Sequence, residues 1–203
     1  VRLADDVKQL KDLIGRSGYS VPVIAKIEKH EAVKNIDEII DASDGLMVAR
    51  GDLGVEVSTE EVPIIQKQII SKTIRAGKPV ITATQMLESM IRSPRPTRAE
   101  ASDVANAIYD GTDAVMLSAE TATGSYPIET VKIMASIAEK TESVIGYADQ
   151  LIHKSNWVRG NTTDAISFAA CELANDLKAK AIIVSTQSGN TARRVSKYRP
   201  SVP

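Results

Sequence analysis

Apolar and polar positions alternate along the chain in a pattern that predicts successive strands and helices. Short apolar runs at residues 21–27, 46–49, 80–83 and 114–117 have the length and composition of buried strands. Amphipathic stretches at residues 31–42, 60–76, 99–109 and 128–144 follow these runs, and another, from residue 3 to residue 14, precedes them. Strands that alternate with helices are typical of a parallel sheet covered by helices. The period alone fits half of an eightfold barrel and an open, doubly wound sheet equally well.

The last third of the chain has a different organisation. Residues 147–160 show no clear period, which predicts a linker. Beyond them we expect a helix at residues 163–177, a strand at 181–185 and a helix at 192–198. The pattern therefore divides the chain into a first domain over residues 1–146, the linker, and the beginning of a second α/β domain over residues 161–203.

Composition and charge narrow the class of protein. The chain has 203 residues, 25 of them basic and 26 acidic, so its net charge of -1 gives no electrostatic basis for binding nucleic acid. The single cysteine, Cys171, can form no internal disulfide, which favours a cytoplasmic location. No apolar run approaches the roughly 20 residues of a membrane helix, so we expect no membrane association. Because the sequence opens at Val1 directly on a helical stretch, we also expect it to be part of a longer chain.

Polar side chains follow each of the four strands of the first domain. They occur two residues apart, a spacing that puts side chains on the same face of a strand. The pairs are Lys26 and Glu28, Arg50 and Asp52, Thr82 and Thr84, and Ser118 and Glu120. Since the carboxyl ends of parallel strands form the ligand-binding face of an α/β sheet, we expect these groups to converge.

The chemistry of this edge favours a divalent cation and an anionic ligand. Lys26 lies between two apolar neighbours, where a charged side chain must be paired or used. Glu28 and Asp52 are hard carboxylate ligands of the kind that hold Mg²⁺ beside a phosphorylated ligand. A network of salt bridges with Lys26 and Arg50 is the alternative interpretation of the same four residues.

Two loops carry further groups that suit an anion. Gly51 follows Arg50 directly and lets the backbone N–H groups approach a carboxylate or phosphate. The loop at residues 185–191 leads from the predicted strand into a helix and is rich in hydroxyl groups, which suits a phosphate; an ordinary strand-to-helix turn with Thr191 as cap is the alternative. Its candidate phosphate-binding residues are Ser185, Thr186, Ser188, Gly189 and Thr191.

Five longer motifs resemble those of the pyruvate kinase family, in the same order. They are Val-Ile-Ala-Lys-Ile-Glu at residues 23–28, Met-Val-Ala-Arg-Gly-Asp-Leu-Gly at 47–54, Thr-Ala-Thr-Gln-Met-Leu at 82–87, Pro-Arg-Pro-Thr-Arg-Ala-Glu at 94–100 and Val-Met-Leu-Ser-Ala-Glu-Thr at 115–121. The resemblance runs over essentially the whole chain. It implies an α/β fold made of the last four βα units of a partial TIM (β/α)₈ barrel, followed by the beginning of the C-terminal α/β domain.

The resemblance also implies roles for individual residues. Lys26 would stabilise charge on the transferring phosphoryl group and on the enolate, and Glu28 and Asp52 would hold Mg²⁺ or Mn²⁺. The N–H groups of Gly51 and Asp52 would hold the substrate carboxylate, with Thr84 on that carboxylate or on the route of the proton. Arg50, Ser118 and Glu120 would form a supporting shell. The ligands of a K⁺ ion would lie mostly outside these residues.

The function implied by this resemblance is phosphoryl transfer from phosphoenolpyruvate to ADP, giving pyruvate and ATP, in a homotetramer that a sugar phosphate activates at residues 185–191. Two alternatives stay open on the residues alone. One is another Mg²⁺-dependent barrel enzyme, a lyase or aldolase that acts on pyruvate-like oxyacids. The other is a non-catalytic module for effector binding or oligomerisation. On their own, the 203 residues are expected to have no useful turnover.

Overall fold

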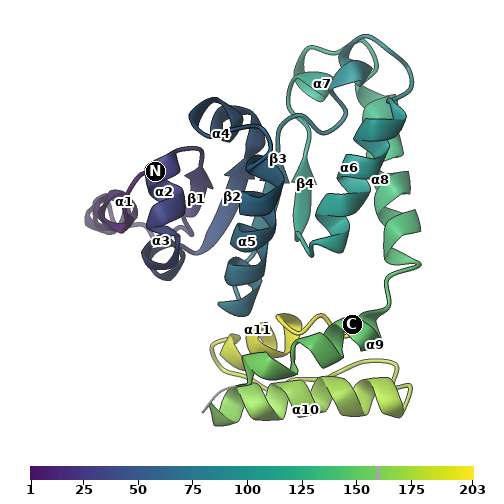
Figure 1. The fold of residues 1–203 in the computed structure, drawn as a ribbon. Coiled ribbons are helices and arrows are strands. Elements are labelled where there is room, and N and C mark those ends of the chain that lie inside the picture. The colour runs from purple at the N-terminus through teal and green to yellow at the C-terminus, as the bar shows by residue number, and fades with distance from the viewer. Residues whose placement is uncertain (159–160) are drawn as a thin grey trace. The chain divides into compact units, whose positions relative to one another are not determined.

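The structure is a computed structural model in which residues 1–158 and 161–203 are described (Figure 1). The chain forms two compact units, unit 1 over Val1–Val144 and unit 2 over Ile145–Pro203. The segment predicted as a linker contains α9 (Tyr147–His153) and the short helix η2 (Ser155–Trp157), and its residues 159–160 lie outside the described residues. The domain boundaries at residues 146 and 161 stay a prediction.

A parallel sheet of four strands forms the centre of unit 1. Its strands are β1 (Ile24–Ile27), β2 (Gly45–Ala49), β3 (Val80–Ala83) and β4 (Ala114–Met116). Each strand pairs with the next one along the chain, in the order β1-β2-β3-β4. A doubly wound sheet reverses its strand order at a switch point, whereas successive units of a barrel do not. The observed order therefore agrees with the predicted partial barrel.

Helices follow the strands of unit 1 (Figure 1). The long ones are α1 (Ala4–Arg16), α5 (Val62–Arg75), α6 (Arg98–Tyr109) and α8 (Pro127–Glu142). The helix expected at residues 31–42 is divided at Asn35 into α2 (His30–Lys34) and α3 (Ile36–Ala42). Three short helices that the periodicity did not predict follow β2, β3 and β4: α4 (Arg50–Glu56), η1 (Glu88–Ile91) and α7 (Ala119–Ala122). They lie where the loops that carry ligand-binding groups were expected.

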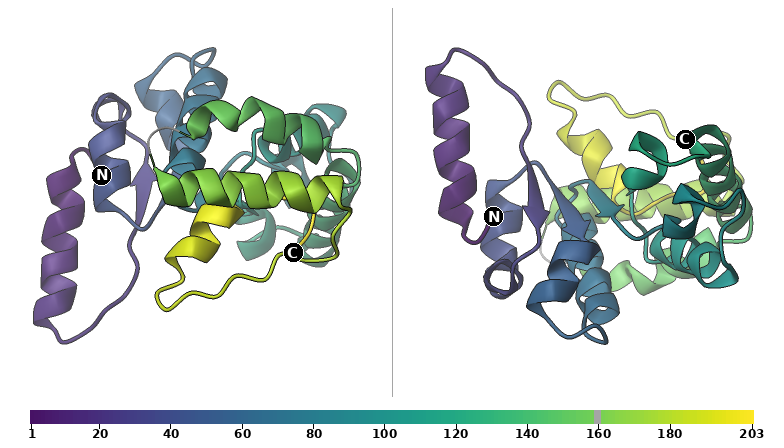
Figure 2. Two further views of the ribbon diagram at one scale, coloured as in Figure 1. Left: turned by 90° about the horizontal axis from the view of Figure 1, so that it is seen from below. Right: turned by 90° about the horizontal axis from the view of Figure 1, so that it is seen from above.

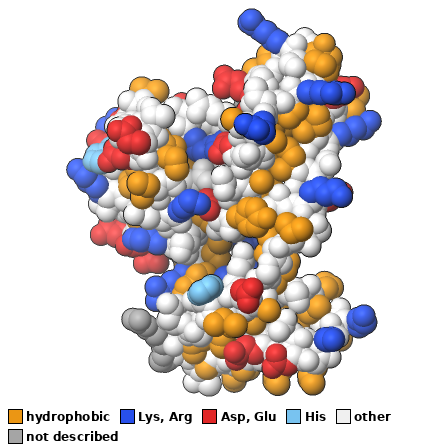
Figure 3. All heavy atoms as spheres, turned by 45° about the vertical axis from the view of Figure 1, so that its right-hand side comes forward, with side chains coloured by type: hydrophobic (Ala, Val, Ile, Leu, Met, Phe, Trp, Pro, Cys, Tyr) orange, Lys and Arg blue, Asp and Glu red, His pale blue; other side chains and the backbone are white. Residues whose placement is uncertain are grey.

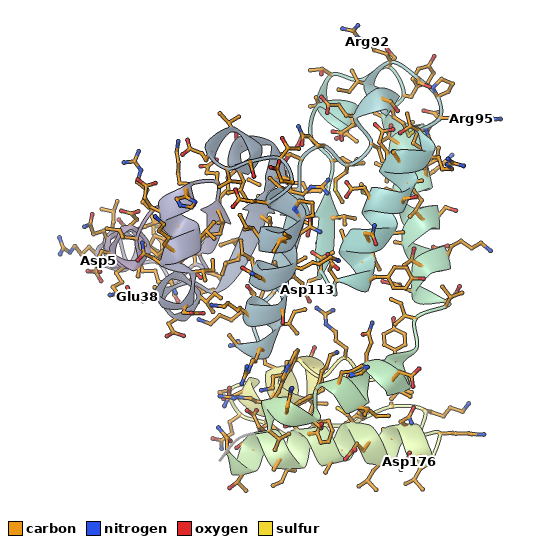
Figure 4. All side chains as sticks on the ribbon, viewed as in Figure 1. Asp5, Glu38, Arg92, Arg95, Asp113 and Asp176 are labelled. Carbon is orange, nitrogen blue, oxygen red and sulfur yellow. The ribbon has the colours of Figure 1, made fainter. Side chains whose placement is uncertain are left out.

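Hydrogen bonds to aspartate side chains fix the amino ends of strands in the sheet. Val23 donates its backbone N–H to Asp44 Oδ2 at 2.7 Å, and Val80 donates its N–H to Asp113 Oδ2 at 2.8 Å. Figure 4 shows Asp113 at the start of β4. At the far end of unit 1, α1 lies outside α2 and α3, beyond β1 (Figure 2). Because β2 is buried almost throughout, the strands form a rigid base for the groups at their carboxyl ends.

Apolar side chains remain exposed on α8. Ile128 and Val131 are both more than half exposed and lie three residues apart, on the same side of the helix. Figure 3 shows hydrophobic side chains gathered on this side of unit 1. Among the residues that the structure describes, no helix has the length and apolar character needed to cross a lipid bilayer.

Unit 2 consists of α9, η2, α10 (Thr162–Asp176) and α11 (Asn190–Ser196). Its core contains Leu151, Phe168, Cys171, Val195 and Tyr198. The strand predicted at residues 181–185 is wrong for this structure: within the described residues of unit 2 no strand forms, and a strand needs a neighbour for its backbone hydrogen bonds. The N–H of Ile182 instead donates to the carbonyl of Pro203 at 2.8 Å.

Lys154 gives unit 2 a testable pH dependence. Burial lowers the pKa of Lys154 to about 8, so its amine loses a proton in the folded state more readily than in the unfolded state. The penalty for burying this charge is full below pH 8 and is relieved as the pH rises towards 10.5. Lys154→Met should therefore stabilise unit 2 at pH 7 by about 1–2 kcal/mol after allowance for partial exposure.

This stabilisation should shrink between pH 8 and pH 10. Chemical unfolding followed by the fluorescence of Trp157, the only tryptophan of the chain, measures it in both proteins. Burial also raises the pKa of Cys171 to about 11 and that of Tyr198 to about 12. The charge of Lys154 lowers the pKa of Cys171 slightly, but the folded thiol and the folded phenol both stay largely protonated up to pH 10, so they add little to the difference. If the difference in unfolding free energy between variant and wild type stays constant from pH 8 to pH 10, the lowered pKa of Lys154 is contradicted.

Candidate active site

One lysine and two carboxylates meet at the carboxyl end of β1 and β2. Lys26 Nζ lies 2.9 Å from Glu28 Oε2 and 2.9 Å from Asp52 Oδ2. Lys26 and Glu28 are close in sequence, at the end of β1, while Asp52 comes from the first turn of α4, after β2. Side chains from neighbouring βα units thus converge on one point, as the sequence analysis expected.

The contacts within this cluster stabilise the charged forms of Lys26 and Asp52. The hydrogen bonds that Lys26 donates to Glu28, and then to Asp52, raise the pKa of Lys26 above its ordinary value. The hydrogen bond from Lys26, followed by that with Glu28, holds the pKa of Asp52 below its ordinary value. The ammonium of Lys26 therefore lies between two carboxyl groups. All three side chains are partly exposed, at 47% for Lys26, 28% for Glu28 and 55% for Asp52, so a ligand can reach them.

The donor set fits a hard divalent cation. Mg²⁺ usually takes one or two carboxylates from the protein and completes its shell with water and substrate oxygens. Glu28 and Asp52 supply two such carboxylates at one exposed point. No group of three or more acidic, histidine or cysteine side chains suited to a metal ion occurs in residues 1–158 and 161–203, so a cage made only of protein ligands is absent from that part of the chain.

A tight turn after β3 lies beside this cluster. Thr84 and Gln85 both have positive φ values, 70° and 54°, in the left-handed region that non-glycine residues rarely adopt. The hydroxyl of Thr84 accepts a hydrogen bond from the N–H of Gly51 at 2.8 Å and donates to the carbonyl of Ala83 at 2.6 Å. A Cβ at Gly51 would lie 3.3 Å from Thr84 Oγ1, so glycine permits this close approach. The N–H predicted to hold a substrate carboxylate is thus bonded to Thr84.

Arg50 reaches the same turn from the other side. Its Nε and Nη2 donate to the carbonyl of Thr84 at 3.1 and 2.8 Å, and Nη2 also donates to the carbonyl of Gln85 at 2.9 Å. The side chain is 7% exposed. Its charge is balanced by Asp103, with Nη1 at 2.6 Å from Oδ2. Arg50 therefore supports the turn rather than facing the open site.

Glu120 supports the turn from α7, the short helix after β4. This side chain is buried, accepts the N–H of Ser118 at 2.7 Å and accepts the N–H of Leu87 at 3.3 Å. Ser118 is the residue before α7, and its backbone N–H is the group that contacts Glu120. Arg50 and Glu120 thus hold the two ends of the segment at residues 84–87, and their role in a supporting shell stays a prediction.

Two of the four polar pairs do not share a face as expected. Arg50 and Asp52 lie in α4, where residues two apart point in nearly opposite directions, and this is why one is buried and the other exposed. Thr82 is inside β3 and donates to Thr112 Oγ1 at 3.0 Å, away from the edge, whereas Thr84 follows the strand. The alternation rule failed for Arg50 and Asp52 because β2 ends at Ala49 and α4 begins at Arg50. It failed for Thr82 and Thr84 because a turn with positive φ begins at Thr84, directly after β3.

The arginine-containing loop before α6 does not join the cluster. In Figure 4, Arg92 and Arg95 point outward from the loop between η1 and α6. The end of this loop is fixed by Thr97 and Glu100, which form a capping box at the start of α6. Both arginines are exposed, and they take no part in the contacts around Lys26.

The hydroxyl-rich loop of unit 2 forms hydrogen bonds within itself. Gly189 donates its N–H to Thr186 Oγ1 at 3.2 Å, and Asn190 donates to Ser188 Oγ at 3.4 Å. Helix α11 begins at Asn190, with Gly189 as its cap at a φ of 76°. The alternative in which Thr191 caps the helix is therefore wrong. Ser185 and Thr191 belong to the same short segment, and a phosphate there stays a prediction.

Sequence reasoning missed Asp103 and Gln66. Gln66, on α5, approaches Arg50 Nη1 at 3.5 Å and donates to Asp110 Oδ2 at 3.0 Å. Both residues lie on helices, far along the chain from Arg50, and no local pattern distinguishes them from other polar helix residues. Only the three-dimensional packing of α5 and α6 reveals their link to the site.

The fold is that of a partial α/β barrel, with a cluster of charged side chains at the carboxyl ends of its first two strands. Comparison with known proteins agrees with that fold. The family model described as "Pyruvate kinase, barrel domain" matches residues 1–131, and the one described as "Pyruvate kinase, alpha/beta domain" matches residues 164–203. The chain belongs to the pyruvate kinase family.

Curated relatives extend the match over the whole chain. The pyruvate kinase of Clostridium acetobutylicum is 55% identical over 204 aligned residues, which cover 100% of this chain and 43% of the relative. Those of Sporosarcina psychrophila and Geobacillus stearothermophilus are 56% and 55% identical, with 100% of this chain and 35% of each relative covered. The chain thus spans less than half the length of these relatives.

Proposed function

We propose that the full-length protein containing this chain transfers a phosphoryl group from phosphoenolpyruvate to ADP. With one proton taken up, the products are pyruvate and ATP. The observation that carries the proposal is the convergence of Lys26, Glu28 and Asp52 on one exposed point, in a chain that belongs to the pyruvate kinase family. No observation favours a lyase, an aldolase or a non-catalytic module, and none of these is proposed further.

In this proposal Lys26 faces the charge that develops on the transferring phosphoryl group and on the enolate oxygen. Phosphoryl transfer depends mainly on positioning and on charge stabilisation, and a fixed ammonium supplies both. Glu28 and Asp52 would hold Mg²⁺ or Mn²⁺, a cation that neutralises phosphate charge when bound. Pyruvate kinases generally use Mg²⁺ and K⁺, but no K⁺ ligand is proposed among these residues.

The remaining groups would orient the substrate. The N–H groups of Asp52 and Gly51 suit the substrate carboxylate, which would replace Thr84 Oγ1 as the acceptor at Gly51. Thr84 Oγ1 would then contact this carboxylate or the route of the proton that the enolate accepts. Arg50, Ser118 and Glu120 would act indirectly, through the segment at residues 84–87, as their hydrogen bonds support.

An assay of the full-length protein tests this function. Pyruvate formation from phosphoenolpyruvate should require both ADP and Mg²⁺, and ATP should appear in equal amount. Pyruvate released without ADP would instead indicate a lyase or phosphatase. The 203 residues alone should show no useful turnover, because their four strands supply only part of a closed barrel.

We also propose that a sugar phosphate binds the loop of unit 2. Thr186 and Ser188 each place a hydroxyl at this turn, supporting a site for one phosphate group. In the full-length protein, Thr186→Ala with Ser188→Ala should weaken binding of fructose 1,6-bisphosphate at least about tenfold, since hydrogen bonds to a charged group are lost. Isothermal titration measures this, with Thr162→Ala as control. Unchanged affinity in the double variant removes the proposal.

The assembly proposed for the full-length protein is a homotetramer in the cytoplasm. Exposed apolar side chains on α8 support an interface, because such groups gain from burial against a partner. The free Cys171 is compatible with a reducing compartment. Sedimentation of the full-length protein over a range of concentrations tests the assembly, and a monomer at every concentration contradicts it.

A further inference from the structure

The turn formed by Thr84 and Gln85 needs an external support. Two successive non-glycine residues with φ values of 70° and 54° are held in a region that their side chains disfavour. Such a conformation persists only where surrounding contacts fix it. The hydroxyl of Thr84, which faces Gly51, depends on this conformation for its position.

The support comes from one guanidinium group. Arg50 donates to the carbonyls of both left-handed residues through Nε and Nη2. Both donors therefore act on the backbone of the turn. For these bonds to persist, the guanidinium itself must be held in one orientation, and its charge must be balanced, because the side chain is buried.

Asp103 meets both requirements. Its Oδ2 lies 2.6 Å from Arg50 Nη1, on the side of the guanidinium away from the turn. Among the described residues, it is the one carboxylate that pairs with Arg50. Gln66 also faces Nη1, but at 3.5 Å and without a charge.

Asp103 is itself placed by a rigid element. It lies one turn after the capping box of α6, in which Glu100 accepts the N–H of Thr97 at 2.7 Å. Glu100 also accepts the N–H of Ser89 at 2.7 Å, which joins the start of α6 to η1. The start of α6, which carries Asp103, is therefore tied to η1.

We propose that Asp103 is a positioning residue of this enzyme: it pairs with Arg50, and Arg50 in turn holds Thr84 at the site. Asp103 touches neither the substrate nor the metal in this scheme. The inference rests on the proposed function, because Thr84 matters to turnover only if the protein is the kinase proposed above. Its structural part, the support of the turn, is testable without any activity.

The experiment uses the full-length protein with three substitutions. Asp103→Ala removes the carboxylate, Asp103→Glu retains the charge, and Asp37→Ala is the matched control, because it removes an exposed carboxylate that pairs with Lys72 in the same unit. Hydrogen exchange followed by mass spectrometry is measured on peptides covering residues 84–87 and on peptides of α8. Steady-state kinetics give kcat and KM for phosphoenolpyruvate.

Asp103→Ala should speed exchange in the peptides at residues 84–87 while α8 exchanges as in wild type. It should lower kcat by about 10- to 100-fold, the effect of a misplaced group at a site. KM should change by no more than about threefold. Asp103→Glu should recover most of kcat, and Asp37→Ala should match wild type in both readouts.

Other results overturn the inference. Exchange at residues 84–87 that stays as in wild type shows that Asp103 does not support the turn. Faster exchange in α8 as well would show that Asp103→Ala loses stability in general. Asp103→Glu then decides the question: if its exchange returns to that of wild type but its kcat does not recover, the proposal is contradicted. A wild-type protein without kinase activity removes the proposed function, while the exchange result still decides the role of Asp103 in the turn.

Discussion

Replacing Lys26 with methionine in the full-length protein should lower kcat by roughly 10³-fold or more, the effect of losing a preorganised group that stabilises transition-state charge. Methionine has nearly the length of lysine but carries no charge, so the site keeps its shape. Binding of Mg²⁺ or Mn²⁺ should be retained or become tighter, because the ammonium no longer competes for Glu28 and Asp52. Steady-state assays and Mn²⁺ titration measure the two effects separately.

Lys29 provides the control for this experiment. It lies three residues after Lys26 and pairs with Glu56 at 2.6 Å, outside the cluster. Lys29→Met removes a lysine from the same region and should leave kcat within about twofold of wild type, because an exposed ion pair of this kind contributes little. Equal losses in both variants would show that general electrostatics, rather than the position of Lys26, determine the rate.

The sequence predicts the sheet well, because its strands are short apolar runs bounded by clear helices. The run at residues 80–83 coincides with β3, and the others differ from the observed strands by a few residues. The strand predicted at residues 181–185 shows the limit of this method. An apolar run marks a segment capable of pairing, but the pairing itself depends on a neighbour that no local pattern supplies.

The candidate site was predictable in part. Lys26 and Glu28 face each other because side chains alternate along a strand, and that rule holds at the end of β1. Asp52 approaches Lys26 from the first turn of α4, not from a strand as the alternation rule assumed. The carbonyls that Arg50 binds are 34 and 35 residues further along the chain, and the partners of such a side chain follow only from tertiary packing.

Removing the negative charges should affect the metal first. Glu28→Gln and Asp52→Asn keep the shape of each side chain but replace a charged ligand with a neutral amide. Removing a residue that hydrogen-bonds to a metal ligand typically lowers metal affinity about 10- to 100-fold. Removing a direct ligand should lower it by at least as much. Each substitution should therefore raise the Kd for Mn²⁺ at least tenfold or so and lower kcat/KM by a similar factor or more.

Glu56→Gln is the matched control, because Glu56 lies on α4 with Asp52 but pairs with Lys29 instead of Lys26. Titration of Mn²⁺, followed by its paramagnetic resonance signal, should show wild-type affinity in this variant. The two substitutions also distinguish the role of the metal from that of the lysine. Lys26→Met should lose turnover with the metal still bound, whereas Asp52→Asn should recover part of its activity as the metal concentration is raised. If Asp52→Asn binds Mn²⁺ as tightly as Glu56→Gln does, Asp52 is not a ligand, and its contact with Lys26 is a salt bridge without a metal-binding role.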